Sequence, residues 1–249
     1  MEGRVVSVMH LGLSNRIKSM VSAFVYTTFA DRYIGLDVKV FWPVNNAVGA
    51  SFDELFDVPG MEVSEYPQKP DIEFRTWRLM SKQGPVDFGY HRISNLIREE
   101  LTCLFAKFRP SDEVSDRRDK LLEKLPKNSC AMLIRTWPNC NYRSAMVTDY
   151  TAMLVDVPDD YTIFISGDSR SAVDDARQLC GDRDTIVHEV SCCNRDTAEG
   201  MKNAFAEQLV AAELPIIIGG HNSTFPEIAW WLGGAKATVL IQPRSQLNM

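Results

Sequence analysis

The chain has 249 residues, of which 45% are hydrophobic and 24% charged, the proportions of a folded globular protein. Its 27 basic and 33 acidic residues give a net charge of −6, and no five like charges follow one another, which argues against nucleic acid as a partner. No stretch of 18 apolar residues or signal-peptide pattern occurs. We therefore expect a cytoplasmic protein without membrane insertion.

Short β-branched runs alternate with amphipathic segments along the chain. The predicted strands are Val5–Met9, Val38–Trp42, Cys130–Arg135, Tyr161–Ser166, Asp184–Val187, Pro215–Gly219 and Ala237–Ile241. The predicted helices are Asn15–Asp31, Ser144–Val155, Ser171–Cys180, Thr197–Ala212 and Phe225–Leu232. Apolar strands separated by helices predict an α/β protein with parallel sheets.

The two halves of the sequence differ in regularity. From Cys130 onward strands and helices alternate regularly, as in one doubly wound domain, whereas the first half carries long segments rich in Pro, Gly and aromatic residues. Ser111 is expected to cap a charged helix that leads toward the second half. We place the domain boundary near Lys127-Asn128, giving domains 1–127 and 128–249.

The composition offers little for a metal ion. The six cysteines are scattered, without a C-x-x-C pair, and are expected to be reduced thiols. His188 lies four residues before Cys192-Cys193, a spacing that does not fit a zinc ribbon. The D-x-D string Asp182-Arg183-Asp184 follows Gly181 in a loop-like context rather than a strand end. We expect no metal cofactor.

A first candidate binding cluster joins the first predicted strand to the first helix. It contains Gly12, Asn15 and Arg16. A glycine here permits close backbone approach, and the helix N-terminus offers unpaired N–H groups to an anion or a sugar hydroxyl. Alternatively, Gly12 only makes the turn and Ser14 or Asn15 only caps the helix. The dinucleotide fingerprint G-x-G-x-x-G is missing.

Two further clusters follow strands of the second half. Arg135 ends the strand from Cys130, where open α/β sheets bind ligands and a guanidinium suits a diphosphate; alternatively it pairs with a surface carboxylate. The turns after two other strands are rich in small and polar residues and precede helices, which favours phosphate binding or, alternatively, simple helix capping. The polar residues of these turns are Asp168, Ser169, His221, Asn222, Ser223 and Thr224.

The order of these motifs resembles a known family. Gly12-Leu13-Ser14-Asn15-Arg16, Val40-Phe41-Trp42-Pro43, Phe52-Asp53-Glu54-Leu55-Phe56, Ile134-Arg135, Gly167-Asp168-Ser169 and Ser223-Thr224-Phe225-Pro226-Glu227 are similar to motifs of the α1,6/α1,2/protein O-fucosyltransferase superfamily, including nodulation fucosyltransferases. The resemblance spans about residues 5 to 241. It implies a GT-B fold, in which two Rossmann-like domains face a cleft, with the GDP-sugar donor mainly on the second domain and the glycan or small acceptor on the first.

The resemblance also implies residue roles. Arg135 matches the arginine that binds the donor diphosphate and assists its departure, and Ser223 and Thr224 match a phosphate-binding pair. Glu207, sixteen residues before Ser223, matches an acidic residue that contacts guanine. Gly12, Asn15 and Arg16 match the loop that lines the cleft. The implied reaction is the transfer of fucose from GDP-fucose without a metal ion and with inversion at the anomeric carbon.

Some positions depart from the family pattern. Leu133 stands where the family has a histidine, and residues 136–142 contain no carboxylate that would serve as a base. A non-catalytic nucleotide-sugar or glycan-binding protein is therefore an alternative, and a nucleotide-binding enzyme of another reaction class is a third. Among the tryptophans, Trp42 and Trp137 are predicted to line the cleft, whereas Trp230 and Trp231 are predicted to lie in the core.

Overall fold

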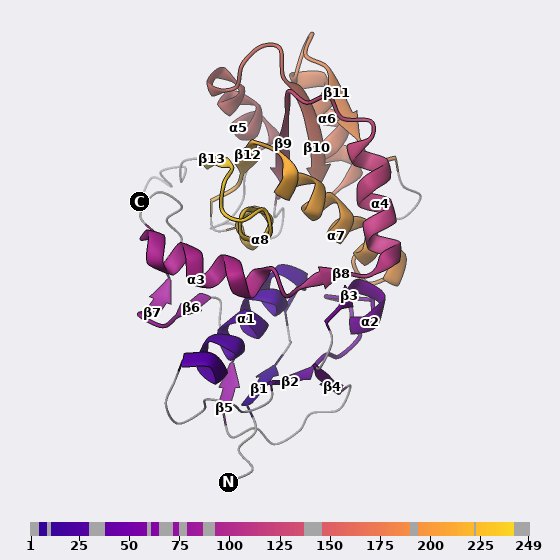
Figure 1. Ribbon diagram of the computed structural model, residues 1–249. Coiled ribbons are helices and arrows are strands. Elements are labelled where there is room, and N and C mark those ends of the chain that lie inside the picture. Colours follow the sequence, from indigo (N-terminus) through magenta and orange to yellow (C-terminus); the bar gives the residue numbers. More distant parts are fainter. Residues whose placement is uncertain are drawn as a thin grey trace, which may run out of the picture. The chain divides into compact units, whose positions relative to one another are not determined.

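The computed structural model describes most of the chain and divides it into two compact units (Figure 1). One unit contains Met1–Ser115 and Asn194–Phe205, and the other contains Asp116–Cys193 and Ala206–Met249. The described residues are 5–8, 11–29, 38–58, 61–64, 72–74, 79–86, 93–136, 146–189, 194–221 and 223–241.

The first unit is built on a four-stranded parallel sheet of order β4-β2-β1-β5. Its strands are β1 (Val5–Val8), β2 (Val38–Phe41), β4 (Glu62–Ser64) and β5 (Ile72–Phe74). Helix α1 (Leu13–Phe29) follows β1 and packs against this sheet. Ile17, Met20, Val21 and Val25 of α1 are buried, at the spacing that places side chains on one helix face.

Shorter elements complete the first unit. They are α2 (Phe52–Leu55), β3 (Phe56–Asp57), β6 (Leu79–Ser81), β7 (Gly84–Val86), α3 (Asn95–Phe105) and β8 (Arg109–Pro110). Strand β3 pairs with β8 and β6 with β7, both antiparallel. Helix α3 begins after Ser94, whose hydroxyl accepts a hydrogen bond from the Ile97 amide at 3.4 Å.

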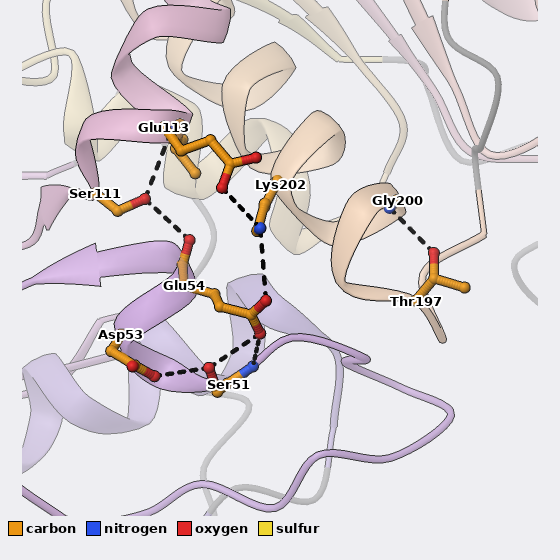
Figure 2. Close-up of polar contacts among 9 residues, drawn as sticks. Ser51, Asp53, Glu54, Ser111, Glu113, Thr197, Gly200 and Lys202 are labelled. Carbon is orange, nitrogen blue, oxygen red and sulfur yellow. Dashed lines mark hydrogen bonds and ion pairs between the residues drawn. The ribbon is translucent and has the colours of Figure 1, made fainter.

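A segment from the second half of the chain belongs to the first unit. Its Lys202 side chain lies between Glu113 and Glu54 (Figure 2). The Lys202 Nζ is 2.7 Å from Glu113 Oε2 and 3.5 Å from Glu54 Oε1. The Gly49 amide donates to the Arg195 carbonyl at 2.8 Å, and the rings of Phe205 and Phe56 lie 4.9 Å apart. The segment Asn194–Phe205 thus packs onto the loop before α2 and onto α2–β3 through polar and aromatic contacts.

The division between the units therefore differs from the predicted boundary at Lys127-Asn128. It falls inside α4 (Asp112–Leu122), and α7 (Ala198–Glu213) crosses it a second time. Ser111 does begin α4 as predicted, since its hydroxyl accepts from the Val114 amide at 3.4 Å. A helix can continue from one unit into the other because its backbone hydrogen bonds are internal. The position of the division is therefore not visible in the composition of the loops, from which the boundary was predicted.

The second unit contains a five-stranded, wholly parallel sheet of order β11-β10-β9-β12-β13 (Figure 1). Its strands are β9 (Ser129–Ile134), β10 (Thr162–Gly167), β11 (Thr185–Val187), β12 (Ile216–Gly219) and β13 (Thr238–Ile241). All six residues of β9 are buried. Each of these strands lies within two residues of its predicted bounds.

Helices cover both faces of this sheet. On one face Met132 and Ile134 pack with residues of α5 (Val147–Thr151), the 3-10 helix η1 (Ala152–Asp156) and α6 (Arg170–Leu179). Leu133 points to the other face and is fully buried as well. Helix α8 (Thr224–Leu232) contacts β12, and its Trp230 and Trp231 are buried, which confirms their predicted place in the core.

The two parallel sheets share one topology. Counted along each unit's own parallel sheet, the strands follow the spatial order third, second, first, fourth, which is typical of Rossmann-like folds. The expected α/β architecture of two Rossmann-like domains is therefore confirmed. None of the helices in the described ranges is both long and apolar enough to cross a membrane.

Candidate functional site

The strongest candidate site lies at the carboxyl edge of the sheet in the second unit. Strand β9 pairs with β10 on one side and with β12 on the other, so the order of connection reverses between β9 and β12. Open α/β sheets bind ligands at such a switch point, beyond the carboxyl ends of the strands. Arg135 follows β9 directly, and Gly220 to Thr224 follow β12.

Arg135 and the N-terminus of α8 are brought together by Phe225. The guanidinium carbon of Arg135 lies 4.1 Å from the centroid of the Phe225 ring, and Nη1 donates to the Ile134 carbonyl at 3.0 Å. Arg135 is half-buried, while Phe225 is 8% exposed and belongs to the first turn of α8. A fixed cation beside the positive end of a helix dipole favours an anion such as a diphosphate.

Ser223 and Thr224 begin α8. Ser223 is the N-cap residue, is 2% exposed, and donates its amide to the Gly220 carbonyl at 3.2 Å. Within the described part of the chain, the Ser223 hydroxyl forms no capping bond. The next residue, Thr224, is half-buried.

The turn before α8 also depends on a glycine. Because α8 approaches the end of β12 closely, a Cβ on Gly219 would lie 2.7 Å from Pro226. His221 is exposed, and Asn222 lies outside the described residues.

Asp168 and Ser169 fix the ends of neighbouring elements. The Asp168 carboxylate accepts from the Thr136 amide at 2.9 Å and from its hydroxyl at 3.2 Å, which ties the end of β10 to the end of β9. Ser169 caps α6 by accepting from the Ala172 amide at 3.2 Å. Capping, one of the two interpretations of Ser169, is therefore present, and contact of either residue with a ligand stays a prediction.

Glu207 reaches the same strand edge from α7. Its Oε2 accepts from the Ser166 hydroxyl at 2.6 Å, and its Oε1 lies 3.1 Å from His188 Nδ1. The side chains of Glu207 and His188 are 15% and 16% exposed. The contacts with Ser166 and His188 hold the carboxylate in one orientation. Each carboxylate oxygen has a further lone pair, so the group can still accept hydrogen bonds from a ligand.

His188 also belongs to this cluster, although the spacing of His188 and Cys192-Cys193 suggested only a metal site for it. The signal for it was its position directly after β11, since the carboxyl ends of parallel strands meet at one edge. Glu207, in contrast, was assigned by resemblance. The structure places it beside Ser166 of β10 and His188, at the edge where Arg135 follows β9.

In the first unit, the predicted loop residues follow β1. The Gly12 carbonyl accepts from the amides of Asn15 and Arg16 at 3.0 and 3.2 Å, and both Gly12 and Asn15 are half-buried. Among the described residues, no atom lies within 4 Å of a Cβ built on Gly12. Packing against the described residues thus does not require glycine at this position.

Arg16 holds two loops together through its side-chain hydrogen bonds. Its Nε donates to the Leu11 carbonyl at 2.8 Å, Nη1 to the Pro43 carbonyl at 2.9 Å, and Nη2 to Asn45 Oδ1 at 3.1 Å. Burial lowers the pKa of Arg16 to about 10, which leaves the side chain charged at neutral pH. Arg16 therefore fixes the loops that follow β1 and β2, and direct contact with a donor stays a prediction.

The prediction that Trp42 lines a cleft is wrong. Trp42 is 1% exposed, its Nε1 donates to the Ala50 carbonyl at 2.9 Å, and its ring packs edge-on against Phe52 and Phe56. Trp42 lies in the core, although it follows a strand end, because α2 and β3 fold back over its ring. Trp137 lies outside the described residues.

The D-x-D string lies at the opposite edge of the sheet from Arg135, because it precedes β11. Arg183 donates to the carbonyls of Leu154 and Val157 at 3.1 and 3.0 Å and to Asp159 at 2.6 Å, so it closes the end of η1. Among the described residues, no three His, Cys, Asp or Glu side chains are grouped to hold a metal ion.

Comparison with known proteins identifies the fold. No family model matches the chain, and no curated protein sequence matches it. Among solved structures, the fucosyltransferase NodZ from Bradyrhizobium is 16% identical with a TM-score of 0.59, over 92% of this chain and 93% of that one. Arabidopsis thaliana FUT1, as a mutant in complex with GDP, is 16% identical with a TM-score of 0.58, over 98% of this chain and 71% of that one.

A third structure extends the same likeness. POFUT1 in complex with GDP is 8% identical to this chain, with a TM-score of 0.59 over 97% of this chain and 99% of that one. At such identities the likeness concerns the fold alone. The chain has a fucosyltransferase-like GT-B fold.

Proposed function

We propose that the protein is a glycosyltransferase that transfers fucose from GDP-fucose to a hydroxyl of a glycan or small acceptor, without a metal ion and with inversion. The observation that carries the proposal is the Arg135 guanidinium stacked on Phe225 at the start of α8, at the switch point of a GT-B-type sheet. Solved structures of this fold have been determined with GDP or GDP-fucose.

The chemistry follows from the charge that develops on the leaving group. The bond between the anomeric carbon and the diphosphate oxygen breaks while the acceptor oxygen bonds to the opposite face of that carbon and releases its proton to water. Negative charge then accumulates on the GDP diphosphate. Arg135 and the N–H groups of the first turn of α8, which follow Ser223, are proposed to stabilise this charge, and preorganised groups of this kind typically lower a barrier by several kcal/mol.

The remaining site residues are proposed to hold the nucleoside and the acceptor. Glu207, oriented by Ser166 and His188, accepts hydrogen bonds from guanine, and the turn residues that follow β10 and β12 contact the ribose and phosphates. In the first unit, Gly12 and Asn15 contact the sugar. Arg16 supports their loop.

A second candidate function is binding of a nucleotide sugar without transfer. Leu133, two residues before Arg135, stands where the related enzymes' pattern has histidine, and its side chain is fully buried in β9. That position therefore supplies no proton acceptor for the incoming hydroxyl. Binding of GDP-fucose without turnover, with a complete set of acceptors, would support this candidate.

The first experiment is a thermal unfolding screen with GDP, ADP, UDP and dTDP, followed by measurement of GDP released from GDP-fucose. GDP at 100 times its dissociation constant is expected to stabilise the folded protein by about 2.7 kcal/mol. Stabilisation by another nucleotide and not by GDP would contradict the GDP assignment. Release of GDP that depends on an acceptor would establish transfer.

Metal independence is tested on the same reaction. Because the proposed cationic groups are Arg135 and the N-terminus of α8, GDP release in EDTA is expected to match release with added Mg²⁺ or Mn²⁺. A rate lost in chelator and restored by Mn²⁺ would refute this part of the proposal.

A further inference from the structure

The backbone of Arg135 is held by one buried hydroxyl group. The Tyr150 Oη accepts a hydrogen bond from the Arg135 amide at 3.1 Å and donates one to the Arg135 carbonyl at 3.0 Å. Tyr150 belongs to α5 and is fully buried. A single side chain thus engages both backbone polar groups of one residue.

These two hydrogen bonds continue the sheet where its strands stop. The pairing of β9 with β10 ends at Ile134, and its pairing with β12 ends at Leu133. Arg135 is therefore the first residue beyond both ladders. There the Tyr150 hydroxyl accepts from the Arg135 amide and donates to the Arg135 carbonyl, and the Asp168 carboxylate accepts from the amide of Thr136.

The same hydroxyl lies against the turn that leads to α8. A Cβ on Gly220 would be 2.4 Å from Tyr150 Oη. The hydroxyl therefore lies between the backbone of Arg135 after β9 and the backbone of Gly220 after β12, the two strand ends at the switch point. Phe225, on which the guanidinium stacks, belongs to the helix that this turn begins.

We propose that Tyr150 is a positioning residue for Arg135: by fixing the arginine backbone against the turn before α8, its hydroxyl keeps the guanidinium on Phe225 and aimed at the diphosphate. This inference rests on the proposed function for the identity of the anion. The placement of the backbone itself is independent of that identity.

The chemistry of the buried phenol agrees with this role. Burial raises the pKa of Tyr150 to about 12, so the hydroxyl keeps its proton and its donor role across the physiological range. A buried hydroxyl costs free energy unless it is hydrogen-bonded, and here both its donor and its acceptor capacity are used. Phenylalanine would fill nearly the same volume, so the substitution isolates the hydroxyl.

The test compares Tyr150→Phe with Tyr161→Phe. Tyr161 packs against the same core cluster, and no described contact joins it to Arg135. In Tyr150→Phe the kcat for GDP release, calculated per GDP-binding site, is expected to fall about 10- to 100-fold, because small misplacements of a catalytic group reduce rates by such factors. The KM for GDP-fucose is expected to change less than about threefold. Tyr161→Phe is expected to keep the kcat of the unchanged protein.

Rescue distinguishes positioning from packing. 4-Aminophenylalanine at position 150 retains a donor and an acceptor at the same place and is expected to restore most of the kcat, whereas 4-fluorophenylalanine has no donor and is not. If Tyr150→Phe fails to fold, the 4-fluoro variant replaces it. Failure of both to fold would overturn the proposal, because the hydroxyl would then serve folding as a whole.

Hydrogen exchange at the Arg135 amide tests the proposal without relying on enzymatic activity. Without the hydroxyl, the Arg135 amide is expected to exchange its hydrogen about 5- to 10-fold faster, the effect of losing one hydrogen bond of about 1 kcal/mol. If the unchanged protein neither binds GDP nor releases it from GDP-fucose, the proposed function fails and this measurement alone decides on Tyr150. An unchanged exchange rate, or an unchanged kcat in an active protein, would overturn the positioning role.

Discussion

The space between Gly220 and the hydroxyl of Tyr150 is too small for a methyl group, since a Cβ on Gly220 would lie 2.4 Å from that oxygen. The tyrosine has no room to retreat because its ring is buried between α5, α6 and the sheet. Glycine at this position is therefore required by packing. The two residues, 70 positions apart in the sequence, constrain each other and the strand end between them.

Gly220→Ala is expected to destabilise the protein by about 1–3 kcal/mol, the usual cost of overpacking. In a Tyr150→Phe background the cost should be smaller, because the nearest remaining ring atom is Cζ at 3.3 Å. Denaturant unfolding of both single variants and the double variant gives the coupling free energy. Gly12→Ala is the matched control, since a Cβ there meets no atom of the described ranges within 4 Å. Strictly additive free energies would contradict the predicted contact.

The raised pKa of Tyr150 predicts a change of stability at high pH. In the unfolded chain a tyrosine loses its proton near pH 10, whereas burial keeps the pKa of Tyr150 at about 12 in the folded protein. The unfolded state is therefore stabilised first as the pH rises, and stability is lost between about pH 10 and pH 12. Unfolding of Tyr150→Phe, followed over the same pH range, should show a smaller decline. Equal declines would mean that Tyr150 does not contribute.

The periodic parts of the fold were predictable from the sequence. Strand β9 and helix α8 are long or apolar enough for their local pattern to determine them, and the order of strands and helices then predicts parallel sheets. Strand β3, with two residues, and α2, with four, carry too little pattern to be found. The grouping of Asn194–Phe205 with the first unit depends on contacts of Lys202 that no local pattern announces.

The candidate site was predictable only in part, for a related reason. Arg135, Asp168 and Ser223 follow strands, and strand ends of a parallel sheet meet at one edge, so their proximity follows from topology. Tyr150 lies within a short helix and looks like an ordinary core residue. Its hydroxyl acts on Arg135 from 15 residues away across the end of β9, and only the tertiary structure shows this.

Arg135→Lys is expected to lower the rate of GDP release from GDP-fucose about 30- to 1000-fold, or about 2–4 kcal/mol of transition-state stabilisation. Lysine keeps the charge but loses the planar fork and its stacking on Phe225. The free energy of unfolding should change little, because Arg135 is only half-buried. Arg177→Lys, on an exposed position of α6, is the matched control. Transfer at the original rate in Arg135→Lys would show that Arg135 is structural.

Glu207→Gln tests recognition of the base. The carboxylate is held by Ser166 and His188 and is expected to accept hydrogen bonds from guanine N1–H and its 2-amino group. Glutamine has nearly the same shape but no charge, so GDP affinity should fall about tenfold, the value of one charge-assisted hydrogen bond. Calorimetric titration with GDP measures the change. Glu213→Gln, exposed at the end of the same helix, should bind GDP as the unchanged protein does.

Inosine diphosphate, which lacks the 2-amino group, separates a direct contact from an indirect effect. The unchanged protein should bind it about tenfold more weakly than GDP, because one acceptor of Glu207 then loses its partner. In Glu207→Gln this preference should largely disappear, since the two substitutions remove the same interaction and their free energies are not additive. A variant that binds GDP more weakly but keeps the full preference would show that Glu207 acts through Ser166 and His188 and does not contact the base.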